Sequence, residues 1–116
     1  MRLVCRSLSE TGLAIVTLHG RHSIYLQHNK AKYMSDELFA IAQSGFESIG
    51  FGYADYHQDF QKAFDKQNAY GIALVSPAYL TRGLQDDTEV RLLDYCERAW
   101  DNHQDVVVLG RPPINA

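Results

Sequence analysis

The stretch "FGYADYHQDF" carries the residue types that a metal site needs. Asp55, His57 and Asp59 alternate there with aromatic residues. In an extended strand the three side chains would share one face, where two carboxylates and an imidazole could bind a single ion. In a helix, His57 would point about 200° around the axis from Asp55, so the three could not share an ion. The secondary structure of this stretch therefore decides its chemistry.

A helix start is the interpretation that we favour for this stretch. Asp55 and Gln58 match the capping-box pattern, in which the first residue caps the helix and the glutamine reaches back to it. The apolar residues that follow recur at helical spacing: Tyr56, Phe60, Ala63 and Phe64. Asp55 is therefore predicted to be an N-cap, and the metal interpretation of this stretch is rejected.

A second candidate pair is His19 and His22 in "HGRH". Gly20 and Arg21 separate two predicted strands, "GLAIVTLH" and "HSIYLQH", as a type II′ hairpin turn would, with Gly20 at positive φ. That register places His19 opposite His22, with their Cβ atoms about 5 Å apart. Two imidazoles need a third ligand, and the sequence identifies none. We favour turn-flanking polar residues over a metal site, so no metal ligand is predicted.

Phosphate-binding and nucleophile motifs are missing from the sequence. Neither G-x-x-x-x-G-K-[ST] nor G-x-G-x-x-G occurs, and Ser76 does not lie in G-x-S-x-G. No complete catalytic constellation can be assembled from the sequence, and no cofactor is predicted.

Length and composition predict one globular domain over residues 1–116. The chain has 46% hydrophobic residues and a net charge of −3, with scattered basic residues. Nucleic acid and anionic membranes are therefore not expected as main partners, because phosphate binding needs clustered Lys and Arg. No apolar run reaches membrane-spanning length, and two isolated cysteines suit a reducing compartment. The expected location is the cytoplasm.

Hydrophobic periodicity predicts alternating strands and helices. A helix should begin after the N-cap Ser35 and stop at Gly45. The other expected elements are the strands "RLVCRSL", "FESIGFGY", "AYGIALVSP" and "DVVVLG" and the helix "DDTEVRLLDYCERAWDNH". This order predicts the α/β class, with a mostly parallel sheet flanked by helices and an N-terminal antiparallel hairpin. The alternative is an α+β antiparallel sheet, which would follow if "FESIGFGY" were not a strand.

One stretch resembles a known family. "YGIALVSPAYL", Tyr70 to Leu80, is similar to the central strand of Toll/interleukin receptor (TIR) domains, in which an apolar strand runs into Ser-Pro and an aromatic-Leu pair. The looser resemblance extends from Ser23 to Leu109. In enzymatic TIR domains a glutamate on the following helix acts on NAD and cleaves the nicotinamide–ribose bond. By position, the resemblance implies that Glu89 would carry this role.

Two functions therefore remain open. The first is a small cytosolic binding or protein-interaction module that self-associates, as a homodimer or another homo-oligomer, or binds another protein. The second is a TIR-type enzyme that cleaves NAD as its substrate, with Glu89 as its catalytic carboxylate. The candidate ligand-binding residues are Tyr53, Ser76 and Tyr79. A pocket that contains Glu89 would favour the enzyme, whereas a solvent-facing Glu89 would favour the module.

Overall fold

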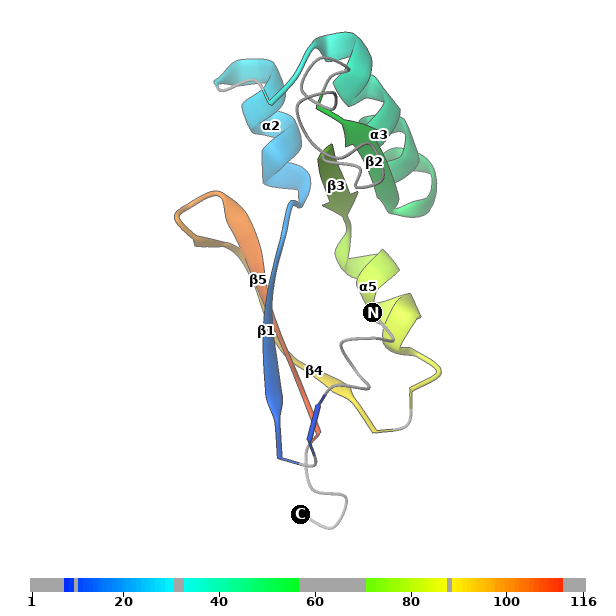
Figure 1. Ribbon diagram of the computed structural model, residues 1–116, viewed down its shortest axis with the longest axis vertical. Coiled ribbons are helices and arrows are strands. Elements are labelled where there is room, and N and C mark those ends of the chain that lie inside the picture. The colour runs from blue at the N-terminus through cyan, green and yellow to red at the C-terminus, as the bar shows by residue number, and fades with distance from the viewer. Residues whose placement is uncertain (1–7, 10, 31–32, 57–70, 88, 112–116) are drawn as a thin grey trace, which may run out of the picture.

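The computed structural model describes residues 8–9, 11–30, 33–56, 71–87 and 89–111. Its elements are β1 (Leu13–Leu18), α2 (Arg21–Asn29), α3 (Asp36–Ile49), β2 (Phe51–Asp55), β3 (Gly71–Val75), α5 (Pro77–Leu84), β4 (Arg91–Trp100) and β5 (Gln104–Gly110) (Figure 1). The strands form two sheets, β1-β5-β4 and β2-β3, in which all neighbours are antiparallel. The predicted α/β class with a mostly parallel sheet is therefore wrong. The observed class is α+β with antiparallel sheets.

Two separate cores give the molecule two lobes. In the lower lobe of Figure 1, α5 packs on the sheet β1-β5-β4; in the upper lobe, α3 packs on β2-β3 beside α2. The lower core comprises Leu80, Leu84, Val90, Val107 and Leu109, and the upper core Met34, Phe39, Ala42, Ala54, Ile72 and Leu74. The radius of gyration is 15.9 Å, against about 13 Å for a compact domain of this length. The molecule is therefore elongated along the axis that joins the lobes.

The predicted N-terminal hairpin is wrong, because Arg21–Asn29 is a helix. Gly20 is its N-cap and has extended backbone angles, φ −108° and ψ −155°, so it neither holds a positive φ nor pairs His19 with His22. Gly20 is needed for space instead: a Cβ there would lie 2.1 Å from a carboxylate oxygen of the buried Asp105. The residues that this helix buries, Ser23 and Gln27, are polar. The sequence therefore has no apolar stripe that would have indicated a helix here.

Helix α3 begins as predicted and ends later. The hydroxyl of Ser35 accepts a hydrogen bond from the amide of Leu38 at 3.3 Å, which confirms the N-cap. The helix passes through Gly45 and ends at Gly50, whose φ of 85° is the left-handed conformation that glycine favours. Gly45 serves close packing, since a Cβ there would lie 2.5 Å from the carbonyl oxygen of Phe51 at the start of β2.

Strand β4 replaces the helix predicted over "DDTEVRLLDYCERAWDNH". Leu92 pairs with Leu109 and Asp94 with Val108, so Leu93 is an extra residue in a bulge. The helix is predicted from the three- and four-residue spacing of Val90, Leu93, Cys96 and Trp100. Of these four residues only Val90 is buried, whereas Leu92 and Tyr95 pack against the core.

The predicted strand "FESIGFGY" is wrong in its first half, which is the end of α3, and correct in its second half, which begins β2. The strands predicted in "GLAIVTLH", "AYGIALVSP" and "DVVVLG" are confirmed as β1, β3 and β5. Asp55 is the last residue of β2, and its carboxylate accepts a hydrogen bond from the Tyr53 hydroxyl at 2.9 Å. The strand "RLVCRSL" and the helix expected after Asp55, with His57 and Asp59, lie outside the described residues.

Candidate functional site

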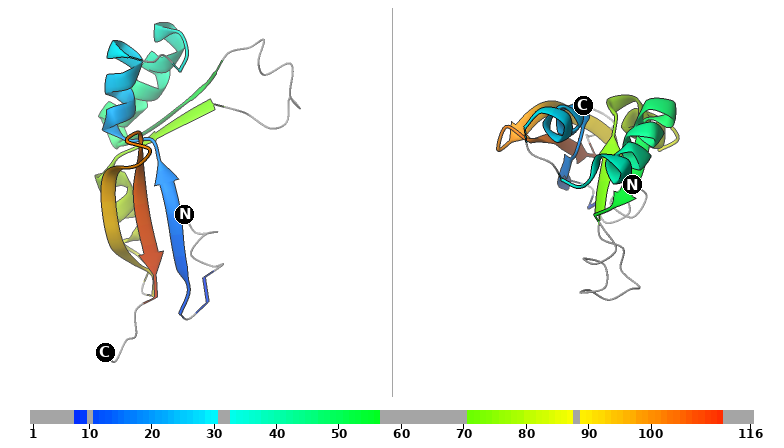
Figure 2. Two further views of the ribbon diagram at one scale, coloured as in Figure 1. Left: turned by 90° about the vertical axis from the view of Figure 1, so that its left-hand side faces the viewer. Right: turned by 90° about the horizontal axis from the view of Figure 1, so that it is seen from above.

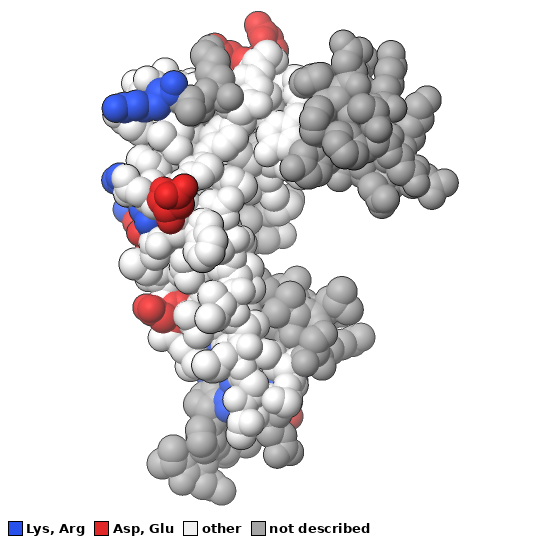
Figure 3. All heavy atoms as spheres, turned by 60° about the vertical axis from the view of Figure 1, so that its left-hand side comes forward, with Lys and Arg blue, Asp and Glu red and all other residues white. Residues whose placement is uncertain are grey.

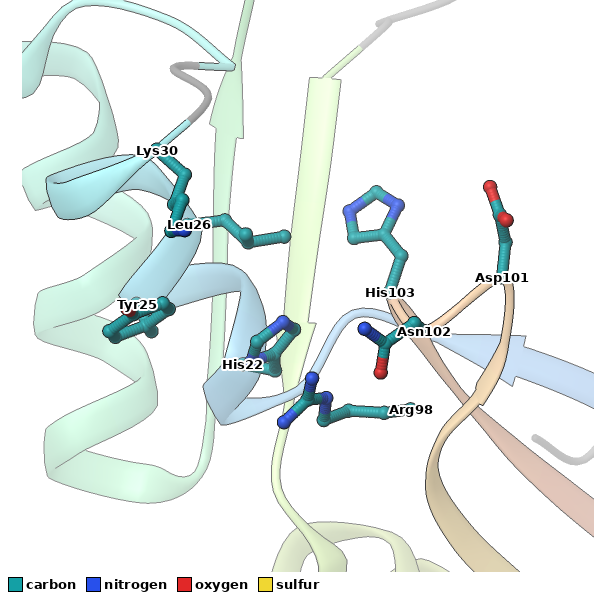
Figure 4. Close-up of a pocket in the computed structure, with 8 residues that line it drawn as sticks. All are labelled: His22, Tyr25, Leu26, Lys30, Arg98, Asp101, Asn102 and His103. Atoms are coloured by element: carbon teal, nitrogen blue, oxygen red, sulfur yellow. The ribbon is translucent and has the colours of Figure 1, made fainter.

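A cavity of about 560 Å³ lies where the two lobes meet, between α2 and the tip of the β4–β5 hairpin (Figure 4). Clefts of this size at the junction of two structural units are common ligand sites. The lining residues are His22, Tyr25 and Leu26 from α2, its C-cap Lys30, and Arg98, Asp101, Asn102 and His103 from the hairpin. Four of these eight side chains are basic or imidazole groups and one is acidic.

A second irregularity of β4 brings Arg98 to this pocket. Between the pairs Cys96–Val106 and Trp100–Gln104, three residues of β4 lie opposite Asp105 alone. Arg98, in the middle, has a φ of 61°, a conformation that costs free energy in residues other than glycine. Figure 4 shows its guanidinium extending toward His22.

Asp105 holds this strained segment in place. The side chain is 2% exposed, and its two carboxylate oxygens accept hydrogen bonds from the Arg98 amide at 3.0 Å and the Tyr95 hydroxyl at 3.1 Å. Burial, followed by the neighbouring Asp105 charge, raises the pKa of Tyr95, so this hydroxyl keeps the proton that it donates.

The hairpin turn positions His103. The amide of His103 donates to the carbonyl of Trp100 at 3.0 Å, and the two residues between them, Asp101 and Asn102, both have a φ of 54°. Positive φ at both central positions is what a type I′ turn requires. The turn ends with His103 beside α2 (Figure 4).

Aromatic contacts join the hairpin to the α2–α3 connection. The His103 ring stacks on Tyr33 with a centroid separation of 5.5 Å, and the Tyr33 hydroxyl is hydrogen-bonded to Nε2 of His103. His19 approaches both rings edge-on, at 5.5 and 5.8 Å. The buried Gln27 holds Tyr33 by accepting its amide at 2.8 Å.

The two histidines at the end of β1 and the start of α2 are biased toward their neutral forms. Burial, followed by the charge of His103, lowers the pKa of His19; burial, then Arg98 and His103, lowers that of His22. Asp105 acts in the opposite direction on both. At neutral pH these rings can therefore accept a proton or a hydrogen bond, beside a fixed positive charge on Arg98.

Stability should fall when the solution is acidified through the histidine range. His19 has a folded-state pKa below its ordinary value of 6.5, so the unfolded chain binds more protons beneath that pH. The contribution of His19 to the free energy of unfolding is therefore largest above pH 6.5, and it decreases as the pH falls toward the folded-state pKa. Urea unfolding between pH 8 and 5 should show this slope, and His19→Gln should reduce it. An unchanged slope in the variant would contradict the assignment.

Glu89 does not lie in the pocket. It lies just before β4, at the end of the strand remote from the hairpin tip, and its carboxylate pairs with the Arg111 guanidinium at 2.5 Å. Its side chain is 61% exposed. The helix on which the sequence placed it is a strand, and this part of the expectation is wrong.

The three predicted ligand-binding residues lie in the upper lobe and at its border. Ser76 is the N-cap of α5 and accepts a hydrogen bond from the Tyr79 amide at 3.1 Å. Tyr79 stacks on Phe51 at 5.2 Å, and Tyr53 is half-exposed on β2 with its hydroxyl on Asp55. The structure thus brings Ser76 and Tyr79 together as a helix start, and none of the three lines the pocket.

Sequence reasoning singled out His19 and His22 but missed their neighbours. The structure places His22 in the pocket and His19 next to His103, and no group of three potential metal-ligating side chains occurs within the described ranges. The missed residues are Arg98 and His103. The signal that could have found them is "DNH", whose Asp and Asn favour a tight hairpin turn.

The chain matches no protein-family model, no curated protein and no solved structure at a significant level. The resemblance to TIR domains therefore stays a prediction. No helix among the described residues is long and apolar enough to cross a membrane.

Proposed function

We propose that the chain is a small protein-interaction module that forms a homodimer through β1. The observation that supports this proposal is an apolar sheet face that no described element covers. Helix α5 packs on one face of β1-β5-β4, and Figure 2 (left) shows the three strands face-on with α5 behind them.

Large hydrophobic side chains lie on the open face. Leu13 and Ile15 of β1 are 64% and 71% exposed, and the register places Val108 of β5 directly beside Ile15. Trp100, at the hairpin end of β4, is 61% exposed. Figure 3 views this side obliquely and shows mainly uncharged atoms over the sheet. Leu13, Ile15 and Val108 are thus neighbouring apolar residues on this face, and a group of exposed apolar side chains can mark an interface.

The two edges of the sheet differ in how they are protected. Strand β4 carries the bulges at Leu93 and around Arg98 together with several charged residues, devices that discourage pairing with a further strand. Strand β1, "LAIVTL", has neither a charged residue nor a proline, and its pairing with β5 is regular throughout. On the side of β1 that faces away from β5, no strand of the described residues is paired with it. The nearest pairing is a single bridge between His19, which follows β1, and Leu74.

A second copy of the chain fits this edge by symmetry. Two β1 strands that pair antiparallel about a twofold axis would join both sheets into one of twice the width. The Leu13 and Ile15 side chains of both copies would then lie on one continuous face and protect each other from water.

The association state should depend on the β1 face. Light scattering coupled to size-exclusion chromatography should give the mass of a dimer for the wild type. Ile15→Lys should give a monomer, because the new charges of the two copies would lie close together across the paired β1 strands and repel each other, and the apolar contacts across the edge would be lost. The matched control is Ile41→Lys, since Ile41 is 59% exposed on α3, away from the sheet; this variant should remain dimeric. A wild-type monomer at high concentration, or a dimer of Ile15→Lys, would refute the proposal.

The compartment that we propose is the cytosol. Cys96 is a free and exposed thiol, and an unpaired surface thiol persists best where the environment is reducing.

The alternative function, NAD cleavage by Glu89, has no supporting contact. The exposed Glu89 is engaged by Arg111, so its charge is already balanced where it would have to oppose a developing cation. The test is nicotinamide release from NAD by the wild type and by Glu89→Gln. Release by the wild type that is lost in Glu89→Gln would support the enzyme hypothesis.

A further inference from the structure

We propose that the pocket between α2 and the β4–β5 hairpin binds the phosphate group of a small organic phosphate, with Arg98, His22 and His103 as the groups that contact it. This inference is independent of dimerisation through β1. It rests on three observations. The pocket is lined by basic side chains, Arg98 reaches it from a backbone position with positive φ, and the cavity is larger than a phosphate group.

The lining is basic in a chain whose net charge is −3. Arg98, Lys30, His22 and His103 face one cavity together with a single carboxylate, Asp101. Within the described part of the chain, neither Arg98 nor Lys30 forms an ion pair, whereas Arg21, outside the pocket, forms a bidentate pair with Glu97 at 2.7 and 2.8 Å. The positive charge of the pocket is therefore available to a ligand.

Arg98 reaches the pocket from a backbone conformation that is unfavourable for residues other than glycine. A residue with φ 61° at the centre of a bulge is held by the buried carboxylate of Asp105, which fixes its amide at 3.0 Å. Bulges and left-handed residues that the surrounding structure enforces are concentrated at functional sites. A planar guanidinium with several donors is well suited to phosphate oxygens, and histidine can add a hydrogen bond or a charge.

The cavity is larger than a phosphate group and has a wall for an organic portion. Its volume of about 560 Å³ is in the range of small-molecule sites. Leu26 supplies an apolar surface, and the Tyr25 ring is stacked on His22 at a centroid distance of 5.6 Å. Figure 4 shows Leu26 and His22 extending from α2 toward the hairpin residues, with the cavity between them.

Binding of a phosphate should be linked to proton uptake. The charged and titratable groups that face His22 are Arg98 and His103 from the hairpin, Asp105 from β5, Tyr25 from its own helix and Lys30 at the C-cap of that helix. Burial and the two positive neighbours lower the pKa of His22. A dianion would offset the repulsion and raise this pKa, so the complex should bind a fraction of a proton more than the free protein near pH 7.

The test is calorimetric titration with phenyl phosphate, inorganic phosphate and phenol. Phenyl phosphate should bind best, inorganic phosphate more weakly, and phenol not measurably. Titrations in two buffers of different ionisation enthalpy should reveal the proton uptake. Equal binding of phenol and phenyl phosphate, or no heat with either phosphate, would overturn the proposal; the best binding by inorganic phosphate would assign the site to the free ion and overturn the organic part.

Arg98→Asn is the informative variant, because asparagine tolerates the left-handed conformation while it removes the charge. It should weaken phenyl phosphate binding by about tenfold to a hundredfold. Arg82→Gln is the matched control, since Arg82 lies on α5 and donates to the Ile49 carbonyl, outside the pocket; its affinity should match that of the wild type. Urea unfolding of both variants checks that the fold is retained, and His22→Leu removes another of the three contacting groups if Arg98→Asn unfolds. Unchanged affinity in a folded Arg98→Asn variant, or in His22→Leu where Arg98→Asn fails to fold, would overturn the proposal.

Discussion

Gly52→Ala should lower the free energy of unfolding by about 3 kcal/mol or more, because the new methyl group has no space. A Cβ on Gly52 would lie 1.7 Å from the carbonyl oxygen of Ala42, in the backbone of α3. A helix backbone cannot move aside as a flexible side chain can, so α3 would have to separate from β2. The upper core, which includes Ala42 and Ala54, would then lose its packing.

The matched control for Gly52→Ala is Gly83→Ala. Gly83 lies inside α5, and a Cβ there meets no atom within 4 Å. Alanine should therefore stabilise the helix by about 0.5–1 kcal/mol. Urea unfolding monitored by circular dichroism measures both effects. Equal stability of Gly52→Ala and the wild type would contradict the close approach of α3 and β2.

Asp105→Ala should destabilise the protein by roughly 3 kcal/mol, because it removes the acceptor of two hydrogen bonds in a buried place. The Arg98 amide and the Tyr95 hydroxyl both donate to this carboxylate, which is 2% exposed and in contact with Gly20. Without it, the bulge of β4 has nothing to hold Arg98 at positive φ. The loss should therefore extend to phosphate binding in the pocket.

Asp105→Asn separates the two contributions of this side chain. Asparagine keeps one carbonyl oxygen for the Arg98 amide and fills the same space, so the fold should lose less than half of the stability that alanine costs. Unfolding measurements on both variants give the comparison. If Asn and Ala are equally damaging, the negative charge rather than the hydrogen bonds is what the structure requires.

Local rules predicted some elements of this fold correctly. The Ser35 cap and the strands β1, β3 and β5 follow from a capping residue or from an apolar run with a clear end. These signals are local, since a few neighbouring residues determine them. They could not fix the class, because the sheet order depends on which strands pair across the chain.

The wrong predictions arose where tertiary contacts override the local pattern. The spacing of Val90, Leu93, Cys96 and Trp100 resembles a helical stripe although β4 is a strand. In α2 the buried residues Ser23 and Gln27 are polar, so the helix has no apolar stripe at those positions. The pocket could not be predicted because of these errors. One wall is α2 and the other includes β4, and the sequence assigned the wrong type to both of these elements, so Arg98 and His103 could not be placed beside His22.

The lower lobe is discontinuous in sequence, and this has a consequence for how the chain is made. Strand β1 precedes the upper lobe in the sequence and its partner β5 follows it, with Leu13 paired to Gly110. During synthesis on the ribosome, β1 leaves the exit tunnel first and remains unpaired and apolar until β5 has been made. The upper lobe lies between them as a continuous segment and can condense first. The long loop closure then makes docking of β1 the slow step, and the nascent strand is a natural substrate for chaperones.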